Sequence, residues 1–250
     1  MRVLLHAHTR WSYDGFLSPA ELGALAARNG FGAVMVSDHV ETLDAARYAQ
    51  LVEECRAVRQ VMVIPGLERS FDGYHVCAFG LPAWVDGGDL ASWSRAVHAA
   101  GGLVSCAHPI RYRHRLPSSI LAASDLVEVW NAHRRYNGAV APDPRAWRLL
   151  DARHVPIASQ DVHRRRDMST VGVEIATVTT PEAVLAEIRG GRLQLVGRLT
   201  RIDGAPRGVQ AALLIALQDV RPVAWAIPVG LYRFVRRLRG VGRRRRSQAS

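Results

Sequence analysis

The stretch that decides the fold is residues 3–15, VLLHAHTRWSYDG, where a short apolar run ends in histidines and is followed by an aspartate. Residues 3–5 are typical of a buried strand. Residues two apart on an extended segment face the same side, so we expect His6 and His8 to converge on one point. Imidazole nitrogens, together with a carboxylate such as Asp14, are ligands that Zn²⁺, Mn²⁺ and Fe²⁺ accept. This stretch therefore predicts a strand that ends in a metal site.

Short apolar segments alternate with helical patterns beyond this first strand. The best-marked helix starts at Ser18, with proline and glutamate in its first turn, and ends near Asn29. Such alternation predicts an α/β fold with a parallel sheet, and the number of units favours a closed barrel. The expected strands lie near residues 3–5, 33–36, 61–64, 74–79, 103–106, 126–130, 156–158, 173–178 and 193–196, and the expected helices near 18–29, 43–59, 89–100, 144–152, 181–189 and 206–218.

Metal-ligand side chains recur where the predicted strands end, which is where barrel enzymes carry their chemistry. They are too many for one ion, so the sequence predicts a cluster of two or three. None of them is a cysteine, which argues against a structural zinc site. The remaining histidines, at positions 98, 114, 133 and 154, are assigned to structural or surface roles. The ligand candidates are His6, His8, Asp14, His39, Glu68, His75, His108, Asp161 and His163.

These segments together resemble the PHP (polymerase and histidinol phosphatase) family of metal-dependent hydrolases over roughly residues 1–200. The motifs are specific in their order and spacing rather than singly. They are His-Ala-His-Thr at 6–9 with Ser-Tyr-Asp-Gly at 12–15, Ser-Asp-His at 37–39, Gly-Leu-Glu at 66–68 with the later His75, Ala-His-Pro at 107–109, and Gln-Asp-Val-His at 160–163.

The resemblance implies a distorted seven-stranded (β/α) TIM-like barrel with a trinuclear site. It implies that the first metal is held by His6, His8, Glu68 and Asp161, the second by Glu68, His75 and His108, and the third by Asp14, His39 and His163. All nine ligand positions are filled. This distinguishes the chain from family members that have lost ligands and serve as structural domains.

The chain departs from the family pattern mainly beside the ligands. Leu4 stands where an acid is common, Ser37 where threonine is usual, Val40 where an acid is common and Gln160 where serine is common. Such neighbours orient ligands, so the changes bear on metal identity and rate. The segment between His75 and His108 is also too short for the inserted domain of the family's nucleotide and short-RNA phosphatases.

The leading functional hypothesis is hydrolysis of a phosphomonoester or small phosphodiester. The site would hold two or three divalent ions (Zn, Mn or Fe), and a hydroxide that bridges two of them would be the nucleophile. We assign catalytic roles to Glu68, Asp161 and His163. The alternatives are an amide, carbamate or ester hydrolase on the same barrel, and a non-catalytic metal-binding regulatory module. The candidate substrate-binding residues are Arg10, Arg69, Arg111, Arg164, Glu128 and Asn131.

The net charge of +11 on 250 residues is located mainly in a tail. Residues 221–250 hold nine arginines and no acid, which leaves 11 − 9 = +2 for residues 1–220. We expect a hydrolase barrel at 1–205 and a helical, Arg-rich tail at 206–250. A basic amphipathic helix in this tail would contact an anionic membrane surface, whereas the favoured interpretation is a helix packed on the barrel followed by a solvated arginine run.

Three scattered cysteines and the lack of a long apolar segment in residues 1–11 predict a cytoplasmic protein. The expected partner is a small phosphoester substrate. Nucleic acid is less favoured as a partner, because the basic charge lies outside the predicted barrel.

Overall fold

The computed structural model describes residues 1–136, 141–198, 200–205, 207–211 and 213–216. The chain divides into two compact units, Met1–Pro206 and Arg207–Ser250. In the second unit, residues 208–211 and 213–216 are helical. The elements described below belong to the first unit, and the predicted tail helix and arginine run at 222–250 lie outside the described residues. Among the described residues, no helix is long and apolar enough to cross a bilayer.

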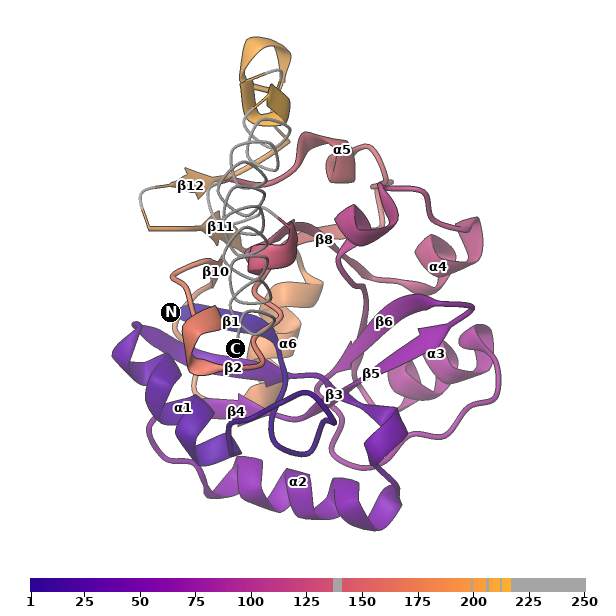
Figure 1. The fold of residues 1–250 in the computed structure, drawn as a ribbon, viewed down its shortest axis with the longest axis vertical. Coiled ribbons are helices and arrows are strands. Elements are labelled where there is room, and N and C mark those ends of the chain that lie inside the picture. Colours follow the sequence, from indigo (N-terminus) through magenta and orange to yellow (C-terminus); the bar gives the residue numbers. More distant parts are fainter. Residues whose placement is uncertain (137–140, 199, 206, 212, 217–250) are drawn as a thin grey trace, which may run out of the picture. The chain divides into compact units, whose positions relative to one another are not determined.

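The first sheet holds the strand that the opening motif predicts. Its order is β12-β11-β10-β1-β2-β4, with β1, β2 and β4 parallel and the remaining neighbours antiparallel. Helices α1 (Pro19–Arg28) and α2 (Ala45–Ala57) pack outside β2 and β4 (Figure 1). The strands are β1 (Arg2–Ala7), β2 (Phe31–Val36), β4 (Met62–Ile64), β10 (Gly172–Glu174), β11 (Gln194–Val196) and β12 (Arg201–Ile202).

The second sheet carries the later motifs, in the order β3-β5-β6-β7-β8-β9. Helix α3 (Leu90–Ala99) and helix α4 (Ser118–Ala123) pack against β7. The strands are β3 (Asp38–His39), β5 (Gly66–Phe71), β6 (Tyr74–Phe79), β7 (Leu103–Cys106), β8 (Leu126–Asn131) and β9 (Val155–Ser159). The other helices are α5 (Pro144–Trp147) and α6 (Pro181–Arg189), with 3-10 turns η1 (Val40–Thr42), η2 (Pro109–Tyr112), η3 (Arg134–Tyr136) and η4 (Arg165–Asp167).

The α/β class is confirmed, and the strands form two six-stranded sheets. The sheets are joined by backbone hydrogen bonds where β9 ends beside β1. The N–H of Gln160 donates to the carbonyl of Leu5 (3.1 Å), and the N–H of His8 donates to the carbonyl of Val162 (2.7 Å). Closure of seven strands into one barrel stays a prediction.

The expectation of an all-parallel sheet is wrong at β6, which runs antiparallel to both β5 and β7. Asp72 and Gly73 form a two-residue turn with φ of 52° and 83°. An Asp-Gly pair favours this tight hairpin, and strands joined by a two-residue turn pair antiparallel. The turn therefore replaces the crossover helix that a parallel neighbour needs.

Other differences lie at the ends of elements. Helix α1 has the expected capping box between Ser18 and Glu21. The strand expected at 173–178 ends at Glu174, because Glu174 pairs with Arg2 and β1 begins there. Helix α5 ends at Trp147 rather than near residue 152.

Gly66 lies close to the backbone of both sheets, two residues before the ligand candidate Glu68. A Cβ at this position would lie 2.2 Å from the carbonyl oxygen of Ala78 and 2.5 Å from that of Val36. Both atoms belong to backbone, so neither gives way as the tip of a flexible side chain would. Only a residue without a side chain fits between these strands.

We therefore expect Gly66→Ala to lower the free energy of unfolding by about 1–3 kcal/mol or more, as overpacking does in other cores. Urea denaturation of the full chain measures this change. Gly88→Ala is the control, since no atom lies within 4 Å of the point that its Cβ would occupy. Equal stability of the two variants would contradict the close packing at Gly66.

Candidate metal centre

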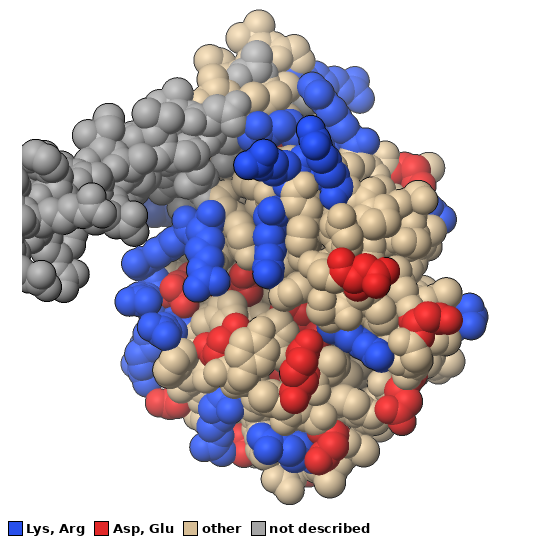
Figure 2. Space-filling model, turned by 45° about the vertical axis from the view of Figure 1, so that its right-hand side comes forward, with Lys and Arg blue, Asp and Glu red and all other residues tan. Residues whose placement is uncertain are grey.

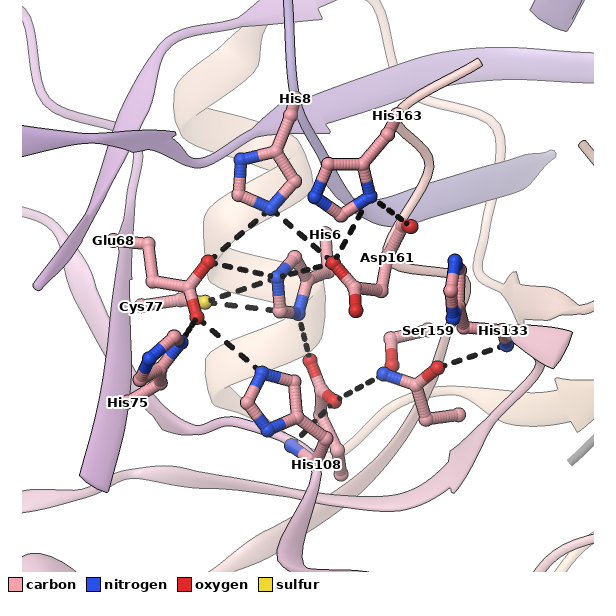
Figure 3. Close-up of polar contacts among 12 residues, drawn as sticks. His6, His8, Glu68, His75, Cys77, His108, His133, Ser159, Asp161 and His163 are labelled. Atoms are coloured by element: carbon pink, nitrogen blue, oxygen red, sulfur yellow. Dashed lines mark hydrogen bonds and ion pairs between the residues drawn. The ribbon is translucent and has the colours of Figure 1, made fainter. Parts of the chain in front are cut away.

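Nine polar side chains predicted as ligands meet at the strand ends, although they come from positions 6 to 163 of the chain. Six of them are at most 5% exposed, and the more exposed ones are Asp14, His75 and His163. Their ligand atoms form several overlapping sets of at least three within 4.8 Å of one another. The nine are His6, His8, Asp14, His39, Glu68, His75, His108, Asp161 and His163. Figure 3 labels those of the group other than Asp14 and His39.

The innermost set consists of two histidines and two carboxylates in alternation. Nε2 of His6 lies 3.2 Å from Oε2 of Glu68 and 3.3 Å from Oδ1 of Asp161. Nε2 of His8 lies at the same distances, 3.2 Å and 3.3 Å, from the same two oxygens (Figure 3). Four ligands held tetrahedrally at about 2.0–2.2 Å from a zinc ion stand about 3.3–3.6 Å apart. The set therefore has the dimensions of a site for one divalent ion.

Glu68 faces a second set of histidines with its other oxygen. Oε1 lies 2.6 Å from Nδ1 of His75 and 3.3 Å from Nε2 of His108. A carboxylate with each oxygen directed at a different group of nitrogen ligands is suited to bridge two cations. The arrangement matches the shared ligand that the family resemblance implies.

A third set lies on the more exposed side. Oδ2 of Asp14 lies 2.9 Å from Nε2 of His163 and 3.6 Å from Nε2 of His39. The ring of His8 stacks on the rings of both these histidines, with centroids 4.3 and 4.7 Å apart. Asp161 and His163, which are two residues apart in sequence, thus serve mainly different sets.

Unpartnered polar atoms show that the residues fit cations. Nε2 of His8 and Oδ1 of Asp14 are buried without a hydrogen-bond partner of good geometry. Buried polar atoms are rarely left so, because their desolvation costs free energy. Nitrogen and carboxylate ligands in this mixture suit Zn²⁺, Mn²⁺ or Fe²⁺.

The electrostatics of the inner set also favour positive charge. Burial alone would raise the pKa of Glu68 and of Asp161, but the surrounding histidines, His6 foremost, hold both well below the usual value. Burial opposes the charge on His8, whereas its contacts with Asp161 and Glu68 raise its pKa to about 10. Protons held in this way occupy the nitrogen atoms that a metal ion would take.

Three ligands have backbone torsions that side-chain-bearing residues rarely adopt. The φ angles are 61° at His6, 31° at His108 and 54° at Asp161. Such conformations cost of order 1–3 kcal/mol each and persist where the surroundings enforce them. At His6 the turn coincides with a shift in the register between β1 and β2. The strand ends are therefore bent to aim these side chains into the ligand cluster.

Glu128 and Asn131, predicted to bind substrate, lie behind the ligands and are at most 5% exposed. Oε1 of Glu128 accepts a hydrogen bond from Nδ1 of His6 (2.6 Å). Its Oε2 accepts from the backbone N–H of His108 (2.7 Å) and from Nδ2 of Asn131 (2.8 Å). In this position Glu128 leaves Nε2 of His6 free for a cation, as carboxylates behind metal-bound histidines do.

The four predicted arginines have different surroundings. Arg111 reaches the cluster, with Nη1 3.4 Å from Nε2 of His75. Nη2 of Arg10 lies 2.7 Å from Oε1 of Glu54, and the guanidinium of Arg69 donates to the backbone carbonyls of residues 87 and 88. The guanidinium carbon of Arg164 lies 4.1 Å from the ring centroid of Phe16. Their substrate-binding roles stay predictions.

Ser12 and Asp38 are positioning groups that were not predicted from the sequence. Ser12 Oγ accepts from the backbone N–H of His39 (2.8 Å) and lies 3.2 Å from Nδ1 of His8. Asp38 accepts both the backbone N–H and the hydroxyl of Thr9, each at 2.6 Å. The sequence signal for Asp38 is its position next to the ligand His39 on β3. Adjacent side chains of a strand face opposite sides, so a carboxylate here points away from the ligand and toward a supporting contact.

Cys77 and His133 were also missed. Sγ of Cys77 lies 3.7 Å from Nδ1 of His6, and burial raises the pKa of this thiol to about 12. The ring of His133 stands 5.8 Å from that of His163, centroid to centroid. Cys77 follows the ligand His75 by two residues on β6, and that same-face spacing was the available signal.

No protein-family profile and no curated protein matches the sequence. Among solved structures, the chain is similar to a two-domain protein containing a predicted PHP-like metal-dependent phosphoesterase from Bacteroides vulgatus (TM-score 0.64, 16% identity), covering 80% of this chain and 66% of that one. It is also similar to a putative metal-dependent phosphoesterase from Bifidobacterium adolescentis (TM-score 0.50, 17% identity), with coverages of 76% and 96%. The chain thus spans slightly less than two thirds of the first protein's length. These likenesses confirm a PHP-like fold.

We predict that Glu128→Gln weakens metal binding about 10–100-fold, the usual range for loss of such a partner. A glutamine whose carbonyl oxygen accepts from His6 places its NH₂ group against the backbone N–H of His108 and the side-chain NH₂ of Asn131. Donors then face donors, and both hydrogen bonds are lost. Competition with a chromogenic chelator measures the affinity. The control is Glu182→Gln, an exposed glutamate at the start of α6. Equal affinities in the two variants would remove Glu128 from the support of the site.

We also predict that cation binding to the metal-free protein at pH 7.5 releases at least one proton per chain. Because the pKa of His8 is about 10, its ring carries a proton at this pH, and the cation must replace that proton. Apparent affinity should therefore rise with pH up to about pH 10. Calorimetric Zn²⁺ titrations in buffers of different ionisation enthalpy count the protons. His98→Gln, at an exposed position on α3, is the control and should leave the number of released protons unchanged. Release of no protons by the unaltered chain would contradict the prediction.

Proposed function

We propose that this chain is a metal-dependent phosphoesterase that hydrolyses a phosphomonoester or a small phosphodiester. The observation that carries the proposal is the position of Glu68, whose two oxygens face two different sets of histidines. A carboxylate shared in this way supports two adjacent cations, and Asp14, His39 and His163 supply ligands for a third. The fold shared with PHP-like proteins supports the same activity, and with it we propose that the two sheets act as one distorted seven-stranded barrel.

Divalent ions at this site would activate water at neutral pH and offset charge on phosphoryl oxygens. The chain's residues hold those ions in a fixed arrangement. Glu68 and Asp161 supply the charged oxygens, and their hydrogen-bonded and ion-paired histidines fix where these oxygens point. Burial of both carboxylates limits competing water, which strengthens their attraction for cations.

A phosphate ester suits the entrance to the site. Arg111 lies beside His75 at the more exposed edge of the cluster, and its guanidinium offers paired donors of the kind that phosphate oxygens accept. Asp14 and His163, 34% and 16% exposed, lie on the edge formed by the third set. A substrate phosphate that enters there meets Arg111 and the three ligand sets together.

The test is turnover by the full chain loaded with Mn²⁺ or with Zn²⁺ on phosphomonoesters, phosphodiesters, short oligonucleotides and aryl carboxyl esters. We expect phosphate release that Asp161→Asn lowers at least 100-fold, because the substitution removes one of two charged oxygens from the inner set. Asp151→Asn, at an exposed carboxylate near the start of β9, is the matched control and should retain full turnover.

Turnover confined to carboxyl esters or amides would overturn the phosphoesterase proposal in favour of a carbonyl hydrolase. Bound metal without turnover of any substrate in the panel would favour a non-catalytic regulatory module.

A further inference from the structure

Arginines alternate with inward-facing side chains on the segment that follows the ligand His108. Arg111, Arg113 and Arg115 are exposed, whereas the two residues between them are partly buried. Tyr112 accepts a hydrogen bond from the backbone N–H of His75 (2.9 Å). This tyrosine is anchored against a ligand strand, so the segment that carries the three exposed arginines is held next to β6, and Arg111 reaches the ligand His75.

The segments that follow β8 and β9 repeat this arrangement. Tyr136 and His133 face inward, with ring centroids 5.2 Å from His108 and 5.8 Å from His163, respectively. Arg134 and Arg135 between them are exposed. Nη2 of Arg134 donates to the backbone carbonyl of Arg166 (2.8 Å), which joins the two segments.

Six exposed arginines therefore lie on the three segments that follow β7, β8 and β9, and one of them, Arg111, contacts a ligand. Within the part of the chain that the structure describes, no carboxylate lies within ion-pair distance of any of the six. Two neighbouring arginines are neutralised, since Arg145 pairs with Asp143 and Arg165 pairs with Glu21. We call the six the arginine rim: Arg111, Arg113, Arg115, Arg134, Arg135 and Arg166.

The rim concentrates positive charge without paired carboxylates among the described residues. Like charges held close together repel, and the repulsion is relieved when an anion lies between them. Figure 2 shows arginine side chains gathered close together on one face of the molecule, with acidic side chains distributed more widely over it. Arg111 is the rim residue whose side chain contacts a ligand, and the other five add positive charge farther from that contact.

We propose that the arginine rim binds phosphate groups of the substrate other than the one that is hydrolysed. This inference rests on the proposed phosphoesterase function and narrows its substrate class to compact esters that carry at least two phosphates. The rim lies on three adjoining segments around one site rather than along an extended track, which favours a small polyphosphorylated molecule over a long strand. Guanidinium groups bind such phosphates through paired hydrogen bonds.

The first experiment compares kcat/KM of the Mn²⁺-loaded full chain for glucose 6-phosphate and glucose 1,6-bisphosphate. We expect the second phosphate to raise kcat/KM at least 10-fold, mainly through a lower KM. The triple variant Arg113→Gln, Arg134→Gln, Arg135→Gln should lose this gain, while its kcat/KM for the monophosphate stays within twofold.

The control variant removes the same charge elsewhere: Arg28→Gln, Arg59→Gln, Arg95→Gln, three exposed arginines at the end of α1, after α2 and on α3. It should keep the full gain from the second phosphate. No gain in the unaltered chain, or an equal loss in both triple variants, would overturn the proposal. A gain seen only with a 5′-phosphorylated ten-nucleotide strand would replace the small substrate with a nucleic acid.

A second measurement separates the rim from the proposed activity. Calorimetric titration of the metal-loaded chain with inositol hexasulfate, which carries no phosphate ester, reports anion binding alone. We expect the rim variant to bind at least 10-fold more weakly than the control variant. If the rim variant binds more weakly but the unaltered chain releases phosphate from no ester, the proposed phosphoesterase activity is rejected and the arginine rim remains an anion-binding site. If both variants bind equally, the arginine rim is rejected as an anion-binding site, whatever the enzyme hydrolyses.

Discussion

The carboxylate of Glu68 is the group on which the rest of the site depends. It is 1% exposed, and its two oxygens lie within 3.3 Å of nitrogens from four histidines on β1, β6 and the segments that follow β1 and β7. A buried negative charge is stable only where positive charge or hydrogen bonds compensate for it. The strand ends must therefore converge on one point, and both the close approach at Gly66 and the left-handed backbone at the ligands follow from that requirement.

Much of the site was predictable because the ligands follow apolar segments whose ends meet in any sheet of this kind. His6 and His8 could be placed on one face from their spacing alone, and the capped helix at Ser18 could be read from its first turn. The arrangement of strands was less predictable. The hairpin at residues 72–73 is indicated by the Asp-Gly pair, but the division into two sheets depends on pairings between residues far apart in the chain.

Nearness in sequence to a ligand proved a weak guide to what an arginine contacts. Arg10, Arg69 and Arg164 each follow a ligand motif closely, yet each guanidinium contacts a glutamate, backbone carbonyls or a phenyl ring instead. Direction decides the matter: on a tight turn, adjacent side chains point to opposite sides, so one residue of a pair meets the ligands while the next meets solvent. Glu128 shows the converse, since it is remote from His6 in sequence and yet orients that ring.

The site places negative charge inside and positive charge around it without the two neutralising each other. The inner carboxylates contact histidines and are withdrawn from solvent. Among the described residues, the contact of Arg111 with His75 is the one hydrogen bond between a rim side chain and a ligand side chain. Cations bound at the centre would offset the inner carboxylates and leave the outer arginines uncompensated. The group that then lowers the electrostatic free energy is an anion that reaches both the centre and the rim. A phosphate bound at the centre supplies an anion for the cations there. Compensation of the arginine rim by the same molecule requires further negative charge on it.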